Sequence, residues 1–270
     1  MKVVLFCGGL GMRLREYSEK IPKPMVTVGD RPILLNIMKY YAFFGHKEFI
    51  LCLGYQAEVI KNYFLTYNKY LSNNFMFSDG GKNLQLMKSD ISDISDWKIT
   101  FVYTGMHSNI GQRLKAVEPY LDGDSMFLAN YSDGLSDLPL PKMINHFDKQ
   151  NKIASFICVK PVNSFHVVKL CGEDSISDIC HLSKSGLWIN GGYFIFRKDI
   201  FDYIKPGDEL VDGPFNRLKK GNQLCAYKYE GFWISMDTFK DKQNLDDMYQ
   251  RGETPWAVWK NGKQYVSINA

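Results

Sequence analysis

The stretch VVLFCGGLGMRLRE, residues 3–16, decides the class of fold. Its apolar run is typical of a buried strand, and it passes directly into a loop that contains Gly8, Gly9 and Gly11. Glycine accepts backbone angles that a side chain forbids, so another group can approach this loop closely.

Positive charge follows the glycines. Backbone N–H groups in such a loop form a nest for an anion, and Arg13 and Lys23 would add charge for a polyphosphate. A nucleotide is the natural ligand. A tight turn with solvated basic residues fits the stretch equally well, because its spacing matches neither a P-loop nor a dinucleotide loop.

Strand-like and helical segments alternate along the chain. Apolar runs typical of strands lie at 2–7, 49–53, 98–103, 125–130 and 153–160. Segments with helical spacing lie at about 33–44, 55–69, 110–119, 140–149, 210–220 and 238–251. This alternation predicts an α/β fold with an open, mixed but mostly parallel central sheet flanked by helices.

One segment interrupts the alternation. NNFMFSDGGKNLQLM, residues 73–87, holds two short alternating runs around Asp79-Gly80-Gly81, which predicts a β-hairpin inserted at about 71–90. Its alternating positions would expose Phe75, Phe77, Leu84 and Leu86. An isolated hairpin buries too little surface to persist alone, so we expect a homo-oligomer.

Composition excludes several functional classes. The chain has 270 residues, 45% of them hydrophobic, and a net charge of +4, which favours a single domain over 1–270 and gives no argument for nucleic-acid binding. Six cysteines without a CxxC pair suit a reducing cytosol. No apolar stretch reaches the roughly 18–20 residues of a membrane span, and no secretory signal is recognisable, so we expect a cytoplasmic protein.

Eight motifs follow one another in the order found in a known family. They are GGLGMRL (8–14), PKPM (22–25), GYQAEVIKNYF (54–64), IGQRLKAV (110–117), FLANYSDGLSDL (127–138), WINGGYF (188–194), GFWISMDTFKDK (231–242) and TPWAVW (254–259). With them the chain resembles the sugar-phosphate nucleotidylyltransferases, most closely those that act as glucose-1-phosphate cytidylyltransferases. The resemblance implies a Rossmann-like nucleotidyltransferase fold. It also implies attack of an acceptor phosphate on the α-phosphate of a nucleoside triphosphate, with release of pyrophosphate.

The resemblance implies roles for the basic residues and the glycines. Gly8, Gly9 and Gly11 would hold the triphosphate, Arg13 would bind the pyrophosphate leaving group, and Lys23 would lie near the α-phosphate. Such a cradle suits phosphoryl transfer, which depends on positioning and charge neutralisation.

Two carboxylates complete the predicted chemistry. Asp133 follows an apolar strand and Asp237 follows another short one, and open α/β sheets bind ligands at the carboxyl ends of their strands. The family uses the matching positions to bind Mg²⁺, whose preferred ligands are carboxylate oxygens. Without the surrounding motifs, an Asp before Gly indicates only a turn or a helix cap.

The segment IGQRLKAV implies the nucleotide. Gly111, Gln112 and Arg113 match the positions that approach base and phosphates in the cytidylyltransferases, which favours CTP over UTP or dTTP. Arg113 also fits a surface position in the first turn of a helix. A binding or regulatory protein that has lost catalysis is the alternative from another class, and retention of the basic residues and carboxylates argues against it.

The acceptor side departs from the family pattern. The resemblance implies acceptor contacts at Asn190 and Gly191, but the expected Glu-Lys-Pro motif is replaced by DICHLSKSGLW, residues 178–188. His181 and Leu182 stand at the Glu and Lys positions. His166 replaces a glycine that approaches the sugar, and Gly213 stands where a carboxylate is expected.

We therefore predict that His166 and His181 bind a phosphorylated acceptor. Lys184 is the alternative cation, and two unrelated histidines on strand faces are the simpler interpretation. The acceptor is glucose 1-phosphate or another phosphorylated small molecule.

Overall fold

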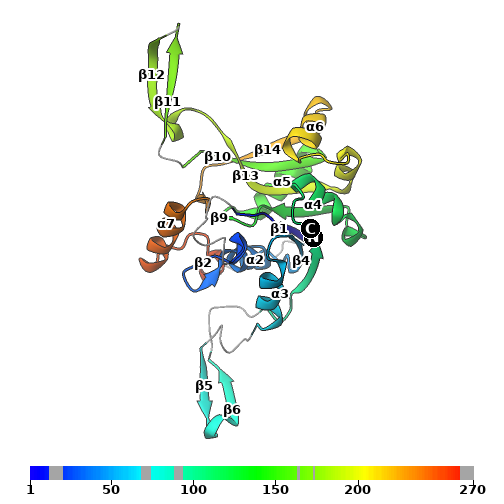
Figure 1. Cartoon of the computed structure of the whole chain (residues 1–270), viewed down its shortest axis with the longest axis vertical. Coiled ribbons are helices and arrows are strands. Elements are labelled where there is room, and N and C mark those ends of the chain that lie inside the picture. The colour runs from blue at the N-terminus through cyan, green and yellow to red at the C-terminus, as the bar shows by residue number, and fades with distance from the viewer. Residues whose placement is uncertain (12–20, 68–73, 88–93, 163–164, 173, 262–270) are drawn as a thin grey trace.

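The computed structural model describes residues 1–11, 21–67, 74–87, 94–162, 165–172 and 174–261. Seven strands form the central sheet (Figure 1). In spatial order they are β14 (Leu224–Tyr229), β10 (Ala154–Val159), β13 (Ile189–Arg197), β8 (Met126–Asn130), β1 (Val3–Phe6), β4 (Glu48–Leu53) and β7 (Lys98–Tyr103).

Strand β1 lies near the middle of this sheet and pairs in parallel with both β4 and β8, and β4 pairs in parallel with β7. Strand β13 is antiparallel to both of its neighbours, whereas β10 and β14 are parallel. The expected mixed, mostly parallel sheet is confirmed.

Each strand of the sheet sends alternate side chains into two cores. In β1, Leu5 enters one apolar cluster and Val4 and Phe6 enter the other. The helices of the first cluster are α2 (Ile33–Phe43), α3 (Ala57–Leu65), α5 (Leu140–Gln150) and α7 (Phe239–Gln250). The second cluster contains α4 (Ile110–Ala116), η4 (Glu118–Leu121), η6 (Lys198–Tyr203), the π-helical turn η7 (Val211–Phe215) and α6 (Asn216–Lys220). Helices therefore cover both faces of the sheet.

The helix predicted over 110–119 ends earlier than its pattern suggested. Helix α4 stops at Ala116 and is followed by the 3₁₀ turn η4, which contains Pro119. A proline ring disfavours helical continuation and lacks the N–H that the ladder requires. The segment expected near 210–220 is likewise divided, into η7 and α6, with Pro214 inside η7.

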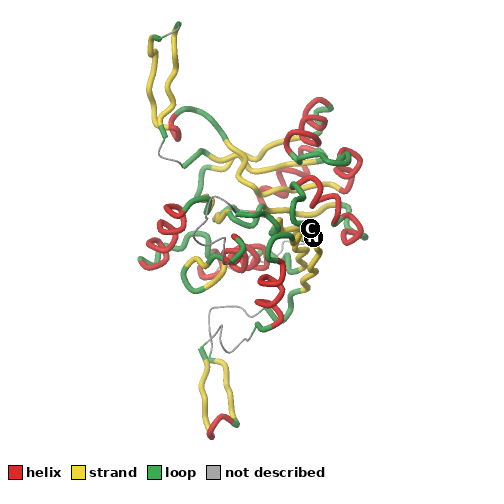
Figure 2. The backbone as a smooth tube through the Cα atoms, in the orientation of Figure 1, coloured by secondary structure: helices red, strands yellow, loops and turns green. Residues whose placement is uncertain are grey.

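Two hairpins extend from opposite ends of the body (Figures 1 and 2). One consists of β5 (Phe75–Ser78) and β6 (Asn83–Leu86), joined by η3 (Asp79–Gly81), which confirms the predicted insertion. Phe75 faces Leu86 and Phe77 faces Leu84 across the strands, and all four side chains are exposed. The other consists of β11 (His166–Cys171) and β12 (Ser175–His181).

The remaining short elements lie outside the seven-stranded sheet. They are η2 (Lys23–Met25), β2 (Thr27–Val28), β3 (Arg31–Pro32), β9 (Gly134–Ser136), η5 (Leu182–Lys184), β15 (Trp233–Ser235) and η8 (Val258–Asn261). Among the described helices, none combines the length and the apolar character that crossing a membrane requires.

Candidate active site

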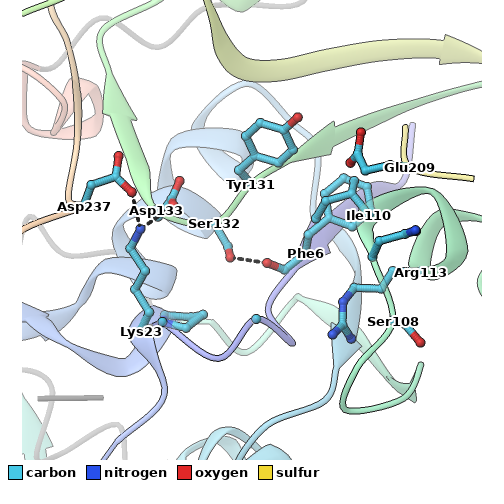
Figure 3. A pocket seen from close by; sticks show the side chains of 14 residues that line it. Phe6, Lys23, Ser108, Ile110, Arg113, Tyr131, Ser132, Asp133, Glu209 and Asp237 are labelled. Atoms are coloured by element: carbon cyan, nitrogen blue, oxygen red, sulfur yellow. Dashed lines mark hydrogen bonds and ion pairs between the residues drawn. The ribbon is translucent and has the colours of Figure 1, made fainter. Parts of the chain in front are cut away.

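A cavity of about 560 Å³ opens at the carboxyl ends of β1 and β8, a volume typical of sites for small molecules. Gly9 and Gly11 line it from the loop after β1, Lys23 from η2, and Asp133 and Asp237 from the far wall (Figure 3). With Arg113, which also lines the cavity, six of the residues that the sequence singled out meet in one place.

Pairing of two short strands brings the carboxylates together. Asp133 directly precedes β9 and Asp237 follows β15 by two residues, and Ser235 of β15 pairs with Gly134 of β9. The backbone N–H of Met236 donates to the carbonyl of Asp133 at 2.9 Å, so the two acidic residues lie side by side at the same end of the paired strands.

Lys23 bridges these carboxylates. Its Nζ lies 2.7 Å from Asp133 Oδ2 and 2.8 Å from Asp237 Oδ1. Burial alone would lower the pKa of Lys23, but the two negative charges outweigh it and hold the pKa above its usual value. Burial raises the pKa of Asp133, and the charge of Lys23 opposes that effect. The cluster therefore consists of one cation and two carboxylates that are partly shielded from solvent.

The same carboxylates fit a divalent cation. Both oxygens converge on a single ammonium group, so they also converge on a point where a metal ion would be held. In the described part of the chain, no group of three or more His, Cys, Asp or Glu side chains has the geometry of a metal site. Two carboxylates suffice for Mg²⁺, which commonly keeps water ligands and takes others from substrate phosphates.

Among the described residues, Arg113 approaches Gly8 of the glycine loop most closely. Its guanidinium donates to the carbonyl of Gly8 at 2.9 Å and to that of Gly105 at 2.8 Å, and it also donates to Thr104 Oγ1 at 2.8 Å. A Cβ at Gly8 would lie 2.1 Å from Arg113 Nη1, so only glycine leaves room for this side chain. Gly9 and Gly11, by contrast, face the cavity.

Arg113 therefore connects two loops and the end of a strand. It is 2% exposed and sits in the wall of the cavity, with its donors directed at the carbonyl of Leu53 at the end of β4 and at carbonyls of the loops after β1 and β7. Direct contact between Arg113 and a nucleotide stays a prediction. The structure itself establishes that the side chain fixes the position of the glycine loop.

Gly111 and Gln112 lie in the first turn of α4. The Gln112 side chain accepts from the backbone N–H of Asn109 at 2.9 Å and the Asn109 side chain accepts from that of Gln112, which forms a capping box. A Cβ at Gly111 would lie 2.3 Å from the carbonyl oxygen of Asp208, so this glycine permits close packing. Their contacts with a nucleotide are untested.

Ser132 holds the turn that carries Asp133. It has a positive φ of 63°, which is uncommon for a residue with a side chain. Its Oγ donates to the carbonyl of Phe6 at 2.6 Å, and its N–H donates to Asn130 Oδ1 at 2.9 Å. The turn is thereby tied to the end of β1.

Comparison with known proteins agrees with this geometry. The family model described as Nucleotidyl transferase matches residues 2–241. The chain belongs to the nucleotidyl transferase family. A glucose-1-phosphate cytidylyltransferase of Salmonella typhimurium (strain LT2) is 34% identical over 262 residues, which cover 96% of this chain and 100% of that relative. A D-glycero-alpha-D-manno-heptose 1-phosphate guanylyltransferase of Campylobacter jejuni is 31% identical, over 75% of this chain and 78% of that relative.

Solved structures show the same fold. A UTP-bound UGPase from Acinetobacter baumannii superposes with a TM-score of 0.69 at 18% identity, covering 95% of each chain. The Rossmann-like nucleotidyltransferase fold expected from the motifs is thus confirmed, and this chain is a nucleotidyltransferase.

Several predicted site residues of this nucleotidyltransferase lie away from the cavity or outside the described residues. Arg13 falls in the segment 12–20 and is outside them. His166 and His181 face each other across the base of the β11–β12 hairpin, with ring centroids 5.5 Å apart, and neither lines the cavity. The Nδ1 atom of His181 accepts from the N–H of Ser183 at 3.2 Å. Their role in acceptor binding stays a prediction.

Asn190 and Gly191 lie on β13, next to the cavity wall. Asn190 Nδ2 donates to the hydroxyl of Tyr131 at 3.4 Å, and Tyr131 lines the cavity. Gly191 accepts from the indole N–H of Trp233 at 2.8 Å, and a Cβ there would lie 2.6 Å from Ile157. The acceptor role predicted for both residues is untested.

Tyr131 and Glu209 are among the lining residues that sequence reasoning missed. Tyr131 belongs to the recognised motif FLANYSDGLSDL but was not singled out, and Glu209 lies in a loop between η6 and η7. The only signal for Tyr131 was its place two residues before Asp133. Nothing in the sequence indicated Glu209, because the packing of its loop against α4 is a tertiary contact.

Proposed function

We propose that this nucleotidyltransferase transfers CMP from CTP to glucose 1-phosphate and releases pyrophosphate. The observation that carries the proposal is the cluster of Lys23, Asp133 and Asp237 beside a glycine loop in one cavity. The Salmonella typhimurium glucose-1-phosphate cytidylyltransferase, 34% identical over its full length, supports the choice of nucleotide and acceptor.

The glycine loop would bind the triphosphate. Gly9 and Gly11 line the cavity without a side chain between their backbone and a ligand. Among the described residues, none beyond the chain neighbours of Gly9 has an atom within 4 Å of the position of its Cβ. Arg113 fixes the position of this loop by donating a hydrogen bond to the carbonyl of Gly8. Arg13 is proposed to bind the pyrophosphate, in keeping with its place in the glycine motif.

In the proposed reaction, a phosphate oxygen of the acceptor forms a bond to the α-phosphorus of CTP. The bond from that phosphorus to the bridging oxygen breaks, and pyrophosphate leaves with the electron pair. Negative charge develops on the oxygens around the α-phosphorus, and the ammonium of Lys23 would neutralise it. Two of its three N–H donors meet the carboxylates, so the third would be the one to donate to that phosphate.

Mg²⁺ is the metal we propose for the two carboxylates. Bound by Asp133 and Asp237, it would add positive charge at the phosphates. The pairing of β9 with β15 fixes the positions of both carboxylates. The hydrogen bond from Ser132 Oγ to the carbonyl of Phe6 also fixes the turn before Asp133.

The acceptor would lie toward β13 and the β11–β12 hairpin. Asn190 is proposed to contact it, together with Gly191, and His166, His181 or Lys184 would supply positive charge for its phosphate. Phe165, which precedes His166, lines a second cavity of about 710 Å³ with Thr238 and Lys240 of the α7 region. That cavity borders the segment that carries Asp237.

We further propose that the enzyme works as a homo-oligomer in the cytoplasm. The exposed row formed by Phe75, Phe77, Leu84 and Leu86 supports packing of the β5–β6 hairpin against a second copy. All six cysteines are free thiols, which supports a reducing compartment.

The decisive experiment measures pyrophosphate release from CTP, UTP, dTTP and GTP with glucose 1-phosphate and a panel of other phosphorylated acceptors. We expect the highest kcat/KM for CTP with glucose 1-phosphate, and loss of turnover in Asp133→Asn. Binding of CTP with no turnover of any acceptor would instead show a nucleotide-binding regulatory protein.

A further inference from the structure

Glu209 lies at the end of the cavity away from the proposed phosphate end. In Figure 3 its side chain is beside Ile110 and Tyr131, whereas Lys23, Asp133 and Asp237 gather on the other side of the view. A nucleotide whose phosphates meet Lys23 and the glycine loop would therefore extend its base toward Glu209. This reasoning rests on the proposed function.

The loop of Glu209 is fixed against the start of α4. Asn109, the N-cap of α4, donates from Nδ2 to the carbonyl of Gly207 at 3.1 Å. Gly111 packs so closely on the carbonyl of Asp208 that any side chain at position 111 would clash. The two residues directly before Glu209 are therefore both in contact with the start of α4, which forms part of the cavity wall.

The carboxylate of Glu209 is itself oriented. Its Oε2 accepts from the backbone N–H of Val211 at 2.7 Å. Within the described residues, Oε1 has no hydrogen bond and neither oxygen forms an ion pair. Arg113 lines the same cavity, but its donors are directed at carbonyls and at Thr104. One oxygen of Glu209 thus remains available to a ligand.

The neighbours of Glu209 suit a flat ring. Phe6, Ile110 and Tyr131 line this part of the cavity, and the rings of Phe6 and Tyr131 lie 6.2 Å apart at 50°. Burial, and then the negative charge of Glu209, raise the pKa of Tyr131, so its hydroxyl stays protonated at neutral pH. A base packed on these side chains would place its polar edge near the carboxylate.

A carboxylate accepts hydrogen bonds and cannot donate them. Cytosine carries an exocyclic amine, which donates, at the position where uracil and thymine carry a carbonyl oxygen, which accepts. We propose that Glu209 is a specificity-determining residue that accepts from the amine of cytosine and repels the carbonyl of uracil and thymine. CTP is thereby selected over UTP and dTTP by one side chain.

The test compares Glu209→Gln with the parent enzyme. The amide keeps the size of the side chain but can donate as well as accept, so it tolerates both kinds of base. We expect the ratio of kcat/KM for CTP to that for UTP to fall by about tenfold or more, the range of one base-reading contact. Glu58→Gln, an exposed residue of α3, is the matched control and should leave the ratio unchanged.

Binding of CMP and UMP, measured by calorimetry, gives a readout that does not depend on turnover. Glu209→Gln should weaken CMP binding relative to UMP binding while the thermal unfolding curve stays that of the parent. If the parent enzyme prefers CTP and the ratio of kcat/KM for CTP to that for UTP is unchanged in Glu209→Gln, the role of Glu209 is overturned while the proposed function stands. A parent that turns over no nucleotide overturns the proposed function, and the CMP and UMP affinities then still decide for or against Glu209.

Discussion

The guanidinium of Arg113 occupies the space that a side chain at Gly8 would fill. Nη2 of Arg113 donates to the carbonyl of Gly8 at 2.9 Å, and a Cβ on Gly8 would lie 2.1 Å from Nη1. At the neighbouring Gly9, no atom of the described residues lies within 4 Å of the position of a Cβ, apart from the adjacent residues of the chain. Two adjacent glycines of one motif thus serve different purposes, one in packing and the other at the cavity.

This difference predicts opposite phenotypes for the two alanine variants. Gly8→Ala should lower the free energy of unfolding by about 1–3 kcal/mol, because Arg113 has to move from its carbonyl partners. Gly9→Ala should leave stability within about 0.5 kcal/mol and weaken CTP binding, because its methyl group would face the cavity. Urea unfolding and CTP calorimetry on both variants check this. Equal destabilisation by the two substitutions would contradict it.

Sequence reasoning singled out Lys23 and the two carboxylates of this cavity because they lie in local patterns. Lys23, Asp133 and Asp237 each sit beside a recognisable strand end or motif, and the sheet brings strand ends together. The inward direction of Arg113 was not foreseen, since a basic residue in a first helical turn has the pattern of a surface residue. The projection of the β11–β12 hairpin, which carries His166 and His181, was also missed, because no local pattern specifies where a hairpin points.

If Asp133 and Asp237 bind a divalent cation as proposed, that cation competes with the ammonium of Lys23 for the same carboxylates. Lys23→Met should therefore raise the affinity of the nucleotide-free protein for Mg²⁺, since the substitution removes the internal cation from between Asp133 and Asp237. The same variant should lower kcat by about 10²–10³, the usual effect of losing one charge-stabilising group. Mg²⁺ titration and pyrophosphate release measure the two effects separately.

Lys242→Met is the control for this pair of measurements. Lys242 forms an ion pair with Asp246 on α7 and does not line the cavity, so the substitution should change neither the Mg²⁺ affinity nor kcat. A Lys23→Met protein with unchanged Mg²⁺ affinity and unchanged kcat would remove Lys23 from the proposed mechanism.

His46 makes the fold sensitive to mild acid. Burial, and then the positive charge of the N-terminus, lower the pKa of His46 to about 4 from 6.5. Between these two pH values the unfolded chain binds a proton that the folded chain does not, so stability falls as the pH decreases from 6.5 toward 4. The stability that His46 contributes is complete above pH 6.5.

Replacing His46 should therefore flatten the pH dependence of stability. Since the side chain is only partly buried, we expect the loss of unfolding free energy between pH 7.5 and pH 5 to be about 1 kcal/mol smaller in His46→Gln than in the parent. Urea unfolding at the two pH values measures it. His107→Gln, at an exposed position, is the control. An unchanged difference in His46→Gln would show that other groups cause the acid sensitivity.

Ser132 combines an unfavourable backbone angle with two favourable hydrogen bonds. Its φ of 63° costs a residue with a Cβ about 1 kcal/mol, which glycine does not incur. The bond from its Oγ to the carbonyl of Phe6, at 2.6 Å, is buried, so its loss leaves a carbonyl without that partner. Ser132→Ala keeps the strain and loses the bond, whereas Ser132→Gly loses both.

Stability should therefore follow the order parent, then Ser132→Gly, then Ser132→Ala. The alanine variant should lose about 1–3 kcal/mol and the glycine variant about 1 kcal/mol less than that. Because this turn also fixes Asp133, both variants should require more Mg²⁺ for half-maximal pyrophosphate release. Thermal unfolding and Mg²⁺ titration check the two effects. If alanine proved at least as stable as glycine at this position, the positive φ would not be a source of strain. An unchanged Mg²⁺ requirement in both variants would show that the β9–β15 pairing alone positions Asp133.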